Sequence, residues 1–465
     1  MNRRRIAMWL PLTAMIFALL VRLLMLGRKS LWLDEAATLR IAATSVEDIV
    51  SGRWDQHPPI YYLLMRCWIR LGRGEFILRL PSALVGVAAI PLLDRLMRQW
   101  GSRWVAMASA WLLAIAPLHI WYSQEARMYA LVCTLGLAST LSYAVAIRRD
   151  SPLAWLAWSV ATLAGLYTQY SMLLIVFAQM VLFGPLWRES GSRRPALWSP
   201  LLALLAVALL FAPQARKLLA QIVRSDWRGG YYYLWVQSIL AGWNIAISPT
   251  QLYVVIVLAG VVVLGAVSVA AWALRERLKQ ARVGPRWAMV AVVIYLLILV
   301  ASAIPRGLGL KRQVSVLLPY ALSGVAAVIS THPYRSRLFL GLVLVTLPLT
   351  GYVVLVQEQE AWRDAAQFLE QRSETQDVIL VNAAYMRQPF EYYYHGDVSY
   401  LGIGPDGVPE TLSEIAESHR RLWLVLSNEK YTDPQGLVRR WLDRNCTWVE
   451  ERTFRRVRVR LYDSR

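Results

Sequence analysis

Long apolar stretches recur along the first 356 residues, and each is close to the length of a membrane-spanning helix. A helix needs about 20 consecutive apolar residues to cross the hydrocarbon core of a bilayer. Stretches of this kind lie at roughly 7–27, 77–97, 104–121, 127–147, 153–169, 171–187, 196–213, 251–273, 287–305, 313–330 and 338–356. The sequence therefore predicts an α-helical polytopic membrane protein with about eleven transmembrane helices.

The composition supports this class and excludes others. Hydrophobic residues make up 57% of the chain and charged residues 17%, whereas soluble domains average about 45–50% and about 25%. The net charge of +20 does not indicate nucleic-acid binding, because the basic residues lie between apolar stretches instead of on one water-facing surface. With 21 Trp and 22 Tyr, the chain is also too rich in aromatic residues for a disordered protein.

The orientation in the membrane depends on segment 58–72, which is apolar but short and is interrupted by Arg66 and Arg70. The Arg residues at 3–5 place the N-terminus in the cytoplasm by the positive-inside rule. If 58–72 does not cross the membrane, every short cytoplasmic loop is basic, whereas a crossing would put all these loops outside. We therefore expect 58–72 to lie at the interface, within a first outer loop at 28–76.

An odd number of crossings places the C-terminal part outside the cell. We expect a transmembrane domain at 1–356 and a small extracytoplasmic α/β domain at 357–465. A second long outer loop is expected at 214–250, with an aromatic run at 231–235 that suits the headgroup level. In the C-terminal part, 361–371 is helix-like and 378–382, 421–427 and 452–462 are strand-like.

Polar and ionisable side chains gather at the outer ends of the predicted helices. Such groups are costly at membrane depth, so a cluster of them is a hypothesis for a functional site. The candidates come from separate outer connections: Asp34, Glu35, Asp55 and His57, then Glu125, Arg127 and Tyr129, then Gln169 and Tyr170, and finally Arg306, Lys311 and Arg312. Together they would supply carboxylates, hydroxyls and fixed positive charge at one level.

This combination suits the transfer of a sugar from a lipid-linked phosphate, whose tail stays in the bilayer and whose head lies at the interface. A carboxylate can take the proton from an attacking acceptor hydroxyl. Arg and Lys side chains can neutralise the phosphate as it leaves. The second, acidic carboxyl that hydrolases use on sugar-oxygen leaving groups is then not required.

Several motifs resemble those of the glycosyltransferase-C (GT-C) superfamily and follow one another in the same order. They are LWLDEA, HPPIYYLL, FILRLPSAL, APLHIWYSQEARMYAL and KRQVSVLLP. The resemblance covers roughly 1–330 and is to bacterial membrane transferases of the protein O-mannosyltransferase and aminoarabinose transferase type. It implies a GT-C fold in a bacterial plasma membrane. It also implies inverting transfer from a polyprenyl-phosphate sugar to a hydroxyl of a glycan, lipid or protein acceptor.

The resemblance further implies roles for individual residues. Asp34 would be the general base, and Glu35 would orient the acceptor or help to bind a metal. Arg127 would face the head of the donor, while Lys311 and Arg312 would contact its phosphate. The remaining substrate-binding candidates are His57, Glu125, Tyr129, Gln169 and Tyr170.

Two positions depart from the pattern of the relatives. His57 stands where relatives often have Lys, and a neutral imidazole is a weaker partner for phosphate. Gln169 stands where relatives often have His, which makes a metal less expected. No cofactor is required by the sequence, and a divalent metal is neither required nor excluded. His119, His332 and His395 have no partners at metal-ligand spacing.

Structural interpretations stay open for most candidates. Glu125 and Arg127 could form a salt bridge with each other, and Arg79 could be an anchor or a ligand for lipid phosphate. Lys311 and Arg312 could be interface anchors, and Tyr129, Gln169 and Tyr170 could be packing residues. At the level of function, the alternative is a transporter or flippase of a lipid-linked or anionic solute. Transporters often contain inverted repeats and place ionisable groups near the bilayer midplane, and the sequence has neither feature.

Overall fold

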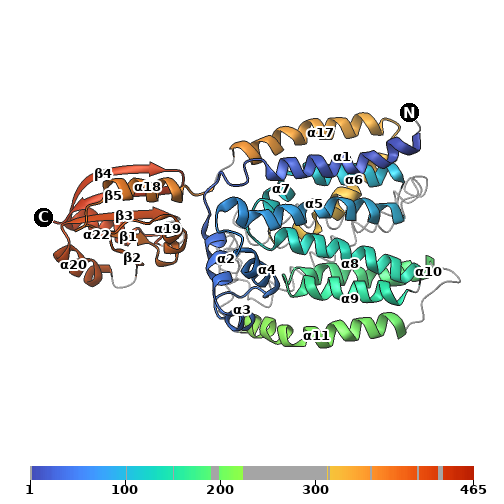
Figure 1. Cartoon of the computed structure of the whole chain (residues 1–465), viewed down its shortest axis with the longest axis horizontal. Helices are drawn as coiled ribbons and strands as arrows, with labels where there is room; N and C mark the ends of the chain where they lie inside the picture. Colours follow the sequence, from blue (N-terminus) through green and yellow to red (C-terminus); the bar gives the residue numbers. More distant parts are fainter. Residues whose placement is uncertain are drawn as a thin grey trace, which may run out of the picture.

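The computed structural model of the chain describes residues 3–100, 102–149, 151–189, 198–223, 312, 315–356, 359–405, 408–427 and 433–465. These residues form a bundle of helices and a C-terminal domain built on a β-sheet (Figure 1). The predicted transmembrane segments 251–273 and 287–305 and the aromatic run at 231–235 lie outside the described residues.

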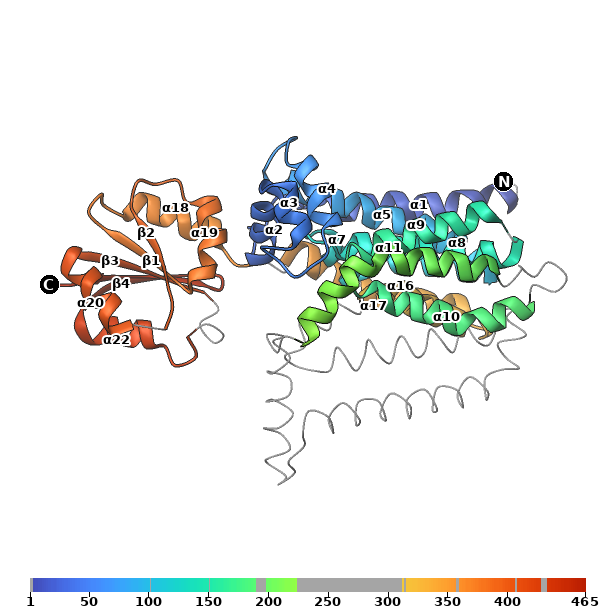
Figure 2. The ribbon, with the colours of Figure 1, turned by 90° about the horizontal axis from the view of Figure 1, so that it is seen from below.

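The helices of the bundle run side by side with roughly parallel axes in both views (Figures 1 and 2). A core of small and aliphatic side chains, with Trp155 and Trp158, holds them together. Within the described residues the bundle comprises α1 (Arg3–Leu23), α5 (Glu75–Trp100), α6 (Arg103–Ile115), α7 (Pro117–Ser123), α8 (Tyr129–Arg149), α9 (Pro152–Leu166), α10 (Met172–Glu189), α11 (Trp198–Val223), α16 (Leu318–Ser330) and α17 (Arg335–Gly351). A short 3-10 turn, η2 (Ser315–Leu317), precedes α16, and a π-helical turn, η3 (Tyr352–Val356), follows α17.

Four helices among the described residues are long and apolar enough to cross a membrane. They are Glu75–Gln99, Tyr129–Arg149, Trp198–Ala220 and Arg335–Val356. In the apolar windows of the last two, only 17% and 11% of residues are buried. A soluble protein rarely exposes apolar surfaces of that extent, whereas lipid tails cover them. The helical membrane architecture is therefore confirmed, but the predicted count of eleven is not.

Two predicted spans differ from the observed helices. The segment 104–121 is not one straight helix, because α6 and α7 meet at an angle of 57°. Pro117 lacks the backbone N–H that would continue α6 and its ring crowds the preceding turn. The other difference concerns α11, which continues through Pro213 to Val223. The start of the predicted outer loop at 214–250 is therefore helical.

The first connection of the bundle folds into short helices at the end nearest the C-terminal domain, opposite the N-terminus (Figure 1). They are α2 (Leu33–Ala43), α3 (Val46–Ser51) and α4 (Ile60–Trp68). With nine residues and a rise of about 1.5 Å per residue, α4 is too short to span a bilayer. This is the segment whose crossing would have reversed the predicted orientation.

The C-terminal domain is a five-stranded sheet with the strand order β2-β1-β3-β5-β4. Strand β1 pairs in parallel with β2 and β3, while β5 pairs antiparallel with β3 and β4. The strands are β1 (Val378–Asn382), β2 (Tyr400–Ile403), β3 (Arg421–Ser427), β4 (Thr447–Phe454) and β5 (Val457–Asp463), and the helices are α18 (Trp362–Arg372), α19 (Arg387–Tyr393), α20 (Val408–Ser418) and α22 (Leu437–Asn445), with a 3-10 turn η4 (Ala384–Met386). The predicted small C-terminal sheet domain is thus confirmed. The predicted strand at 452–462 is instead most of a hairpin, β4 and β5.

Specific contacts fix the C-terminal domain to the bundle. Arg363 of α18 forms an ion pair with Glu75 at the start of α5. Tyr393 of α19 donates its hydroxyl to Glu75 at 2.9 Å and accepts the backbone N–H of Leu31 at 2.6 Å. The hydroxyl of Tyr392 donates to the carbonyl of Arg73 at 2.7 Å. As a result, α19 faces α2 across the junction (Figure 1).

Candidate active site

Asp34 lies near the start of α2 and is paired with a cation from a distant part of the chain. Nη1 of Arg312 donates to Oδ2 of Asp34 at 2.8 Å. About one quarter of each side chain is exposed, 25% for Arg312 and 26% for Asp34. The guanidinium of Arg312 also stacks on Trp32, 4.6 Å from the ring centroid. Asp34 is therefore an accessible carboxylate beside a positioned positive charge.

Arg127 provides a second positive charge at the start of α2. It is 4% exposed, and Nη1 donates to the carbonyl of Asp34 at 3.3 Å and to Oγ1 of Thr38 at 3.2 Å. The same nitrogen lies 3.3 Å from the hydroxyl of Tyr62 and 4.0 Å from Oδ2 of Asp55. Arg127 pairs with Asp55 and not with Glu125 in the contacts of the described residues. The salt bridge between Glu125 and Arg127 that the sequence left open is therefore not formed in the part of the chain that the structure describes, and Arg127 instead joins a network beside Asp34.

Asp55 completes this network on the loop before α4. Burial raises the pKa of Asp55, but His57, Arg127 and the Tyr62 hydroxyl, which donates to the carboxylate, lower it by more, so the pKa lies below its ordinary value. Asp55 is therefore ionised at neutral pH and compensates Arg127. The sequence placed Asp55 in a motif but gave no reason to link it with Arg127.

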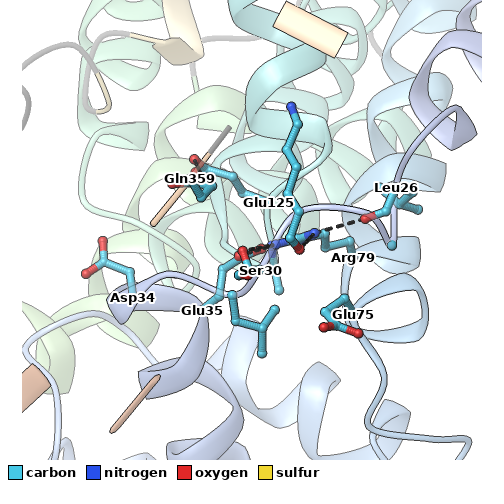
Figure 3. Close-up of polar contacts among 12 residues, drawn as sticks. Leu26, Ser30, Asp34, Glu35, Glu75, Arg79, Glu125 and Gln359 are labelled. Carbon is cyan, nitrogen blue, oxygen red and sulfur yellow. Dashed lines mark hydrogen bonds and ion pairs between the residues drawn. The ribbon is translucent and has the colours of Figure 1, made fainter. Parts of the chain in front are cut away.

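Glu35 points away from Asp34 (Figure 3), as expected for neighbours about 100° apart on a helix. It is fully buried, and Arg79 binds both of its carboxylate oxygens, at 2.8 and 2.7 Å. The backbone N–H of Ala126 donates to Oε1 at 2.8 Å. Glu35 therefore fixes α2 to neighbouring segments. The sequence instead suggested that it orients the acceptor or binds a metal.

Arg79 is an anchor and not an open ligand for lipid phosphate. Besides binding Glu35, it donates to three carbonyl oxygens in the connection between α1 and α2 (Figure 3). These belong to Leu26 at 3.0 Å, Lys29 at 2.8 Å and Ser30 at 3.0 Å. With the side chain 2% exposed, no donor of its guanidinium is available to a substrate.

The break between α6 and α7 positions the connection at 124–128. Arg22 of α1 is fully buried at this break and donates to the carbonyls of Leu113 at 3.3 Å and Ala114 at 3.1 Å. Those carbonyls lie at the end of α6, where a regular helix would not satisfy them all. Arg22 also donates to Nδ1 of His119 at 2.7 Å. His119 is therefore a structural residue.

A second set of hydrogen bonds ties the same connection to α1, and here a residue of the connection is the donor. Nε2 of Gln124 donates to the carbonyls of Val21, Arg22 and Leu24, at 3.3, 3.1 and 3.0 Å. These carbonyls lie at the C-terminal end of α1, where intrahelical partners run out. Arg22 of α1 thus caps the end of α6, and Gln124 caps the end of α1. Together these hydrogen bonds hold the segment that leads to Asp34 against the one that leads to Arg127.

Glu125 lies in this connection and is buried against the segment that enters the C-terminal domain. Its Oε1 accepts a hydrogen bond from Nε2 of Gln359 at 3.3 Å (Figure 3), and Oε2 has no hydrogen-bond partner among the described residues. Burial raises the pKa of Glu125 to about 8, and the neighbouring carboxylate of Glu35 adds to the rise. The nearby Tyr129 is buried as well and packs on Tyr122, with ring centroids 4.8 Å apart.

His57 lines a small pocket of about 280 Å³ between α3 and α11, together with Gln214, Lys217 and Asp55, which also belongs to the network around Arg127. Burial and the charge of Arg127 lower the pKa of His57, so the imidazole is neutral at neutral pH. Nζ of Lys217 donates to the carbonyls of the α3 end, Val50 and Ser51. The pocket therefore contains a cation that the sequence did not single out.

The remaining candidates divide into those the structure places elsewhere and those it does not describe. Tyr170 accepts a hydrogen bond from Nε2 of Gln214 at 2.8 Å and so lies beside the His57 pocket. Gln169 is buried next to it. Neither contacts Asp34 in the described contacts, whereas Arg127 and Arg312 do. Lys311, like Arg306, lies outside the described residues. The described part also has no group of three or more His, Cys, Asp or Glu side chains that could hold a metal ion.

Several residues of this site could not be singled out from the sequence. Tyr62 and Thr38 read as ordinary members of helical segments, and Lys217 lies where a long loop was expected. Arg22 lies inside a predicted apolar span, where a charged residue is itself a signal of a special role. That signal could have drawn attention to it.

Comparison with known proteins gives a family match for part of the chain. The family model for dolichyl-phosphate-mannose-protein mannosyltransferases matches residues 56–215. The matched region contains His57, Arg127 and Tyr170, while Asp34 and Arg312 lie outside it. No curated protein matches the chain in sequence.

Solved structures share the fold over nearly the whole chain. ArnT from Cupriavidus metallidurans bound to undecaprenyl phosphate is 14% identical, with a TM-score of 0.56, and 99% of this chain and 98% of that chain are covered. The archaeal oligosaccharyltransferase AglB from Archaeoglobus fulgidus, in complex with an inhibitory peptide and a dolichol-phosphate, is 12% identical, with a TM-score of 0.51. There, 93% of this chain and 71% of that chain are covered.

The family match and the shared fold confirm the resemblance drawn from the sequence. They indicate a multi-pass membrane glycosyltransferase of the GT-C type, similar to the mannosyltransferases and to ArnT. Neither comparison supports the alternative of a transporter or flippase.

Proposed function

We propose that this chain transfers a sugar from a polyprenyl-phosphate donor to a hydroxyl acceptor, with inversion, at the outer face of a bacterial plasma membrane. The observation that carries this proposal is the part-exposed carboxylate of Asp34, which pairs with Arg312, while Arg127 binds the backbone carbonyl of the same residue. A base beside concentrated positive charge is the apparatus that displacement of a phosphate by a hydroxyl requires.

Asp34 acts as the general base. It accepts the proton of the acceptor hydroxyl as that oxygen attacks the anomeric carbon, and the bond from this carbon to the phosphate oxygen breaks. The neighbouring carboxylate of Glu35 is sequestered by Arg79. Glu35 is therefore not available to form a covalent sugar intermediate of the kind that retaining glycosidases use. This favours a single displacement, which inverts the anomeric configuration.

Arg312 binds the donor phosphate. Its guanidinium is held in place by Trp32 and is partly accessible, and guanidinium groups bind phosphate oxygens in bidentate geometry. Since the guanidinium of Arg312 is paired with Asp34, a phosphate that binds Arg312 competes with Asp34 for it. Binding of the donor thereby releases the carboxylate that acts as base.

The lipid-phosphate donor is supported by the two solved structures, whose ligands are undecaprenyl phosphate and a dolichol-phosphate. The pocket at His57 adds a further basic group, because Lys217 lies in it while His57 is neutral. We assign Lys217 the phosphate contact that the sequence suggested for His57.

The outer location is supported by the charge pattern. The short loops predicted to be cytoplasmic are basic, and α2 with Asp34 lies at the end of the bundle opposite the N-terminus (Figure 1). By the positive-inside rule, this end and the C-terminal domain face the outside.

Mass spectrometry of lipid-linked sugars in a strain that lacks the protein tests this function. We expect one polyprenyl-phosphate sugar to accumulate and one envelope glycan, glycolipid or glycoprotein to lose a sugar. The wild-type gene should reverse both changes, and the Asp34→Asn gene should reverse neither. Unchanged lipid-linked sugars and unchanged glycans would contradict the proposal.

A further inference from the structure

A groove of about 760 Å³ lies at the junction of the helical bundle and the C-terminal domain. Its walls come from α2 on one side and from α18, α19 and the following turn on the other. The volume is in the range of pockets that hold drug-sized ligands, about 300–1,000 Å³. The residues that matter for its chemistry are Arg40, Arg73, Gln367, Glu370, Gln388 and Tyr392.

This groove is separate from the site around Asp34. The α2 residues that line it are Ala36, Leu39, Arg40 and Ala43, which share one face of the helix. Asp34 and Thr38 lie on the opposite face, where both contact Arg127. A helix with its side chains is about 10 Å across. A chain molecule that passes around α2 can therefore occupy both places at once.

The lining offers hydrogen-bond donors and acceptors together. Arg40 and Arg73 are exposed guanidinium groups that form no ion pair with a described residue. Oε1 of Gln388 is a buried acceptor with no hydrogen-bond partner among the described residues. The carboxylate of Glu370 accepts only one of its possible bonds in the described contacts, from the backbone N–H of His395 at 2.6 Å.

This mixture favours one class of ligand. The lining carries carboxylates as well as guanidinium groups, and Glu370, which forms no ion pair with a described residue, disfavours a phosphate or another polyanion. A hydrophobic peptide would find few large apolar side chains there. Sugar hydroxyls both donate and accept, so they can satisfy guanidinium, amide and carboxylate groups at once, and Tyr392 adds an aromatic side chain.

We propose that the groove binds the non-reacting part of a glycan acceptor, so that the C-terminal domain selects an acceptor that already carries sugars. This inference rests on the proposed transferase function and narrows its acceptor from any hydroxyl compound to an oligosaccharide-bearing one. Binding energy from the remote part of a substrate is then available to position its reacting hydroxyl at Asp34.

Photo-crosslinking in living cells tests the inference without knowledge of the acceptor. The photoreactive residue p-benzoylphenylalanine is introduced at Gln367 of the full-length protein and, as a control, at the exposed Arg452 of β4. After irradiation, adducts are analysed by mass spectrometry for carbohydrate. We expect a carbohydrate adduct at position 367 and none at 452. We also expect Arg73→Ala to lower its yield roughly tenfold, the effect of losing one hydrogen bond to a charged group.

The outcomes separate this inference from the proposed function. Crosslinking needs no turnover, so an Asp34→Asn background should still give the adduct. Two results would overturn the groove assignment and leave the transferase function intact. One is an adduct at position 367 that contains only lipid or protein. The other is no adduct at 367 while a crosslinker at Trp32, beside Asp34, captures sugar. Failure of the proposed transferase function would show separately, as unchanged glycans in the strain that lacks the gene. Equal yields from Arg73→Ala and wild type would also overturn the assignment.

Discussion

The guanidinium of Arg312 lies 2.8 Å from the carboxylate of Asp34, although 278 positions separate them in the chain. The contact joins the connection between α1 and α5 to the segment before α16. It places the proposed base and a cation within one hydrogen bond. In the proposed reaction, a donor phosphate replaces Asp34 as the partner of Arg312.

Replacing Arg312 should impair use of the donor. We expect Arg312→Gln to lower kcat/KM for the polyprenyl-phosphate sugar by about 10²-fold, comparable to the loss of one group that stabilises developing charge. Steady-state transfer assays in detergent or nanodiscs measure this. Arg335 is the matched control, since it also stacks on a tryptophan, Trp104, at 5.8 Å. Equal effects of Arg312→Gln and Arg335→Gln would contradict the assigned role.

Glu35 should be needed for folding more than for chemistry. In Glu35→Gln, the guanidinium of Arg79 remains buried without its counter-charge, which typically costs about 3–5 kcal/mol. Glu391→Gln is the control, because its ion pair with Arg387 is part-exposed and should contribute at most about 1 kcal/mol. Unfolding of the purified protein measures both. A stable but inactive Glu35→Gln enzyme would instead make Glu35 a catalytic residue.

Glu125 should make stability depend on pH. Its pKa is about 8 in the folded protein against an ordinary 4.5, so the folded state holds the proton more tightly than the unfolded state. The resulting stabilisation is complete below pH 4.5 and is lost as the pH rises through 8. Thermal unfolding from pH 5 to 9 should show this decline in the wild type and a flatter curve in Glu125→Gln. Identical curves would contradict the assigned pKa.

Gly86 should tolerate no side chain, because Ser123 at the end of α7 packs against it. A Cβ there would lie 2.2 Å from Oγ of Ser123, and such overpacking costs about 1–3 kcal/mol. A Cβ at Gly341 of α17 would meet no atom within 4 Å, so Gly341→Ala should be neutral or slightly stabilising. Unfolding midpoints test the pair, and Gly86→Ala/Ser123→Gly should recover stability. A neutral Gly86→Ala would show that the packing around this glycine can relax.

The parts of the fold that could be predicted are those with a strong local pattern. Strands β1 and β3 were predicted with the observed bounds because continuous apolar runs suit strands buried on both faces. Strand β2 was missed because its four residues, Tyr400–Ile403, include a glycine and have no apolar alternation. In the bundle, Pro117 marked the break between α6 and α7, but an apolar composition on both sides suggested one helix.

The parts of the site that could not be predicted depend on side-chain direction and on long-range contacts. Asp34 and Glu35 are adjacent carboxylates in the sequence, and only the turn of α2 separates them into an accessible group and a buried anchor. Likewise, no local pattern links Arg127 with Asp55 or Arg79 with Glu35. A sequence can indicate that such groups gather at one level, but it does not assign their partners.

The account depends most on Asp34 as the general base. Single-turnover transfer by Asp34→Asn, Asp34→Glu and wild-type enzyme tests this directly, with Asp48→Asn on the neighbouring helix α3 as control. A general base contributes about 10²–10⁴-fold, so Asp34→Asn should lose at least about 10²-fold in rate while it still folds and binds donor, and Asp48→Asn should be unaffected. A rate for Asp34→Asn close to that of wild type would contradict the account.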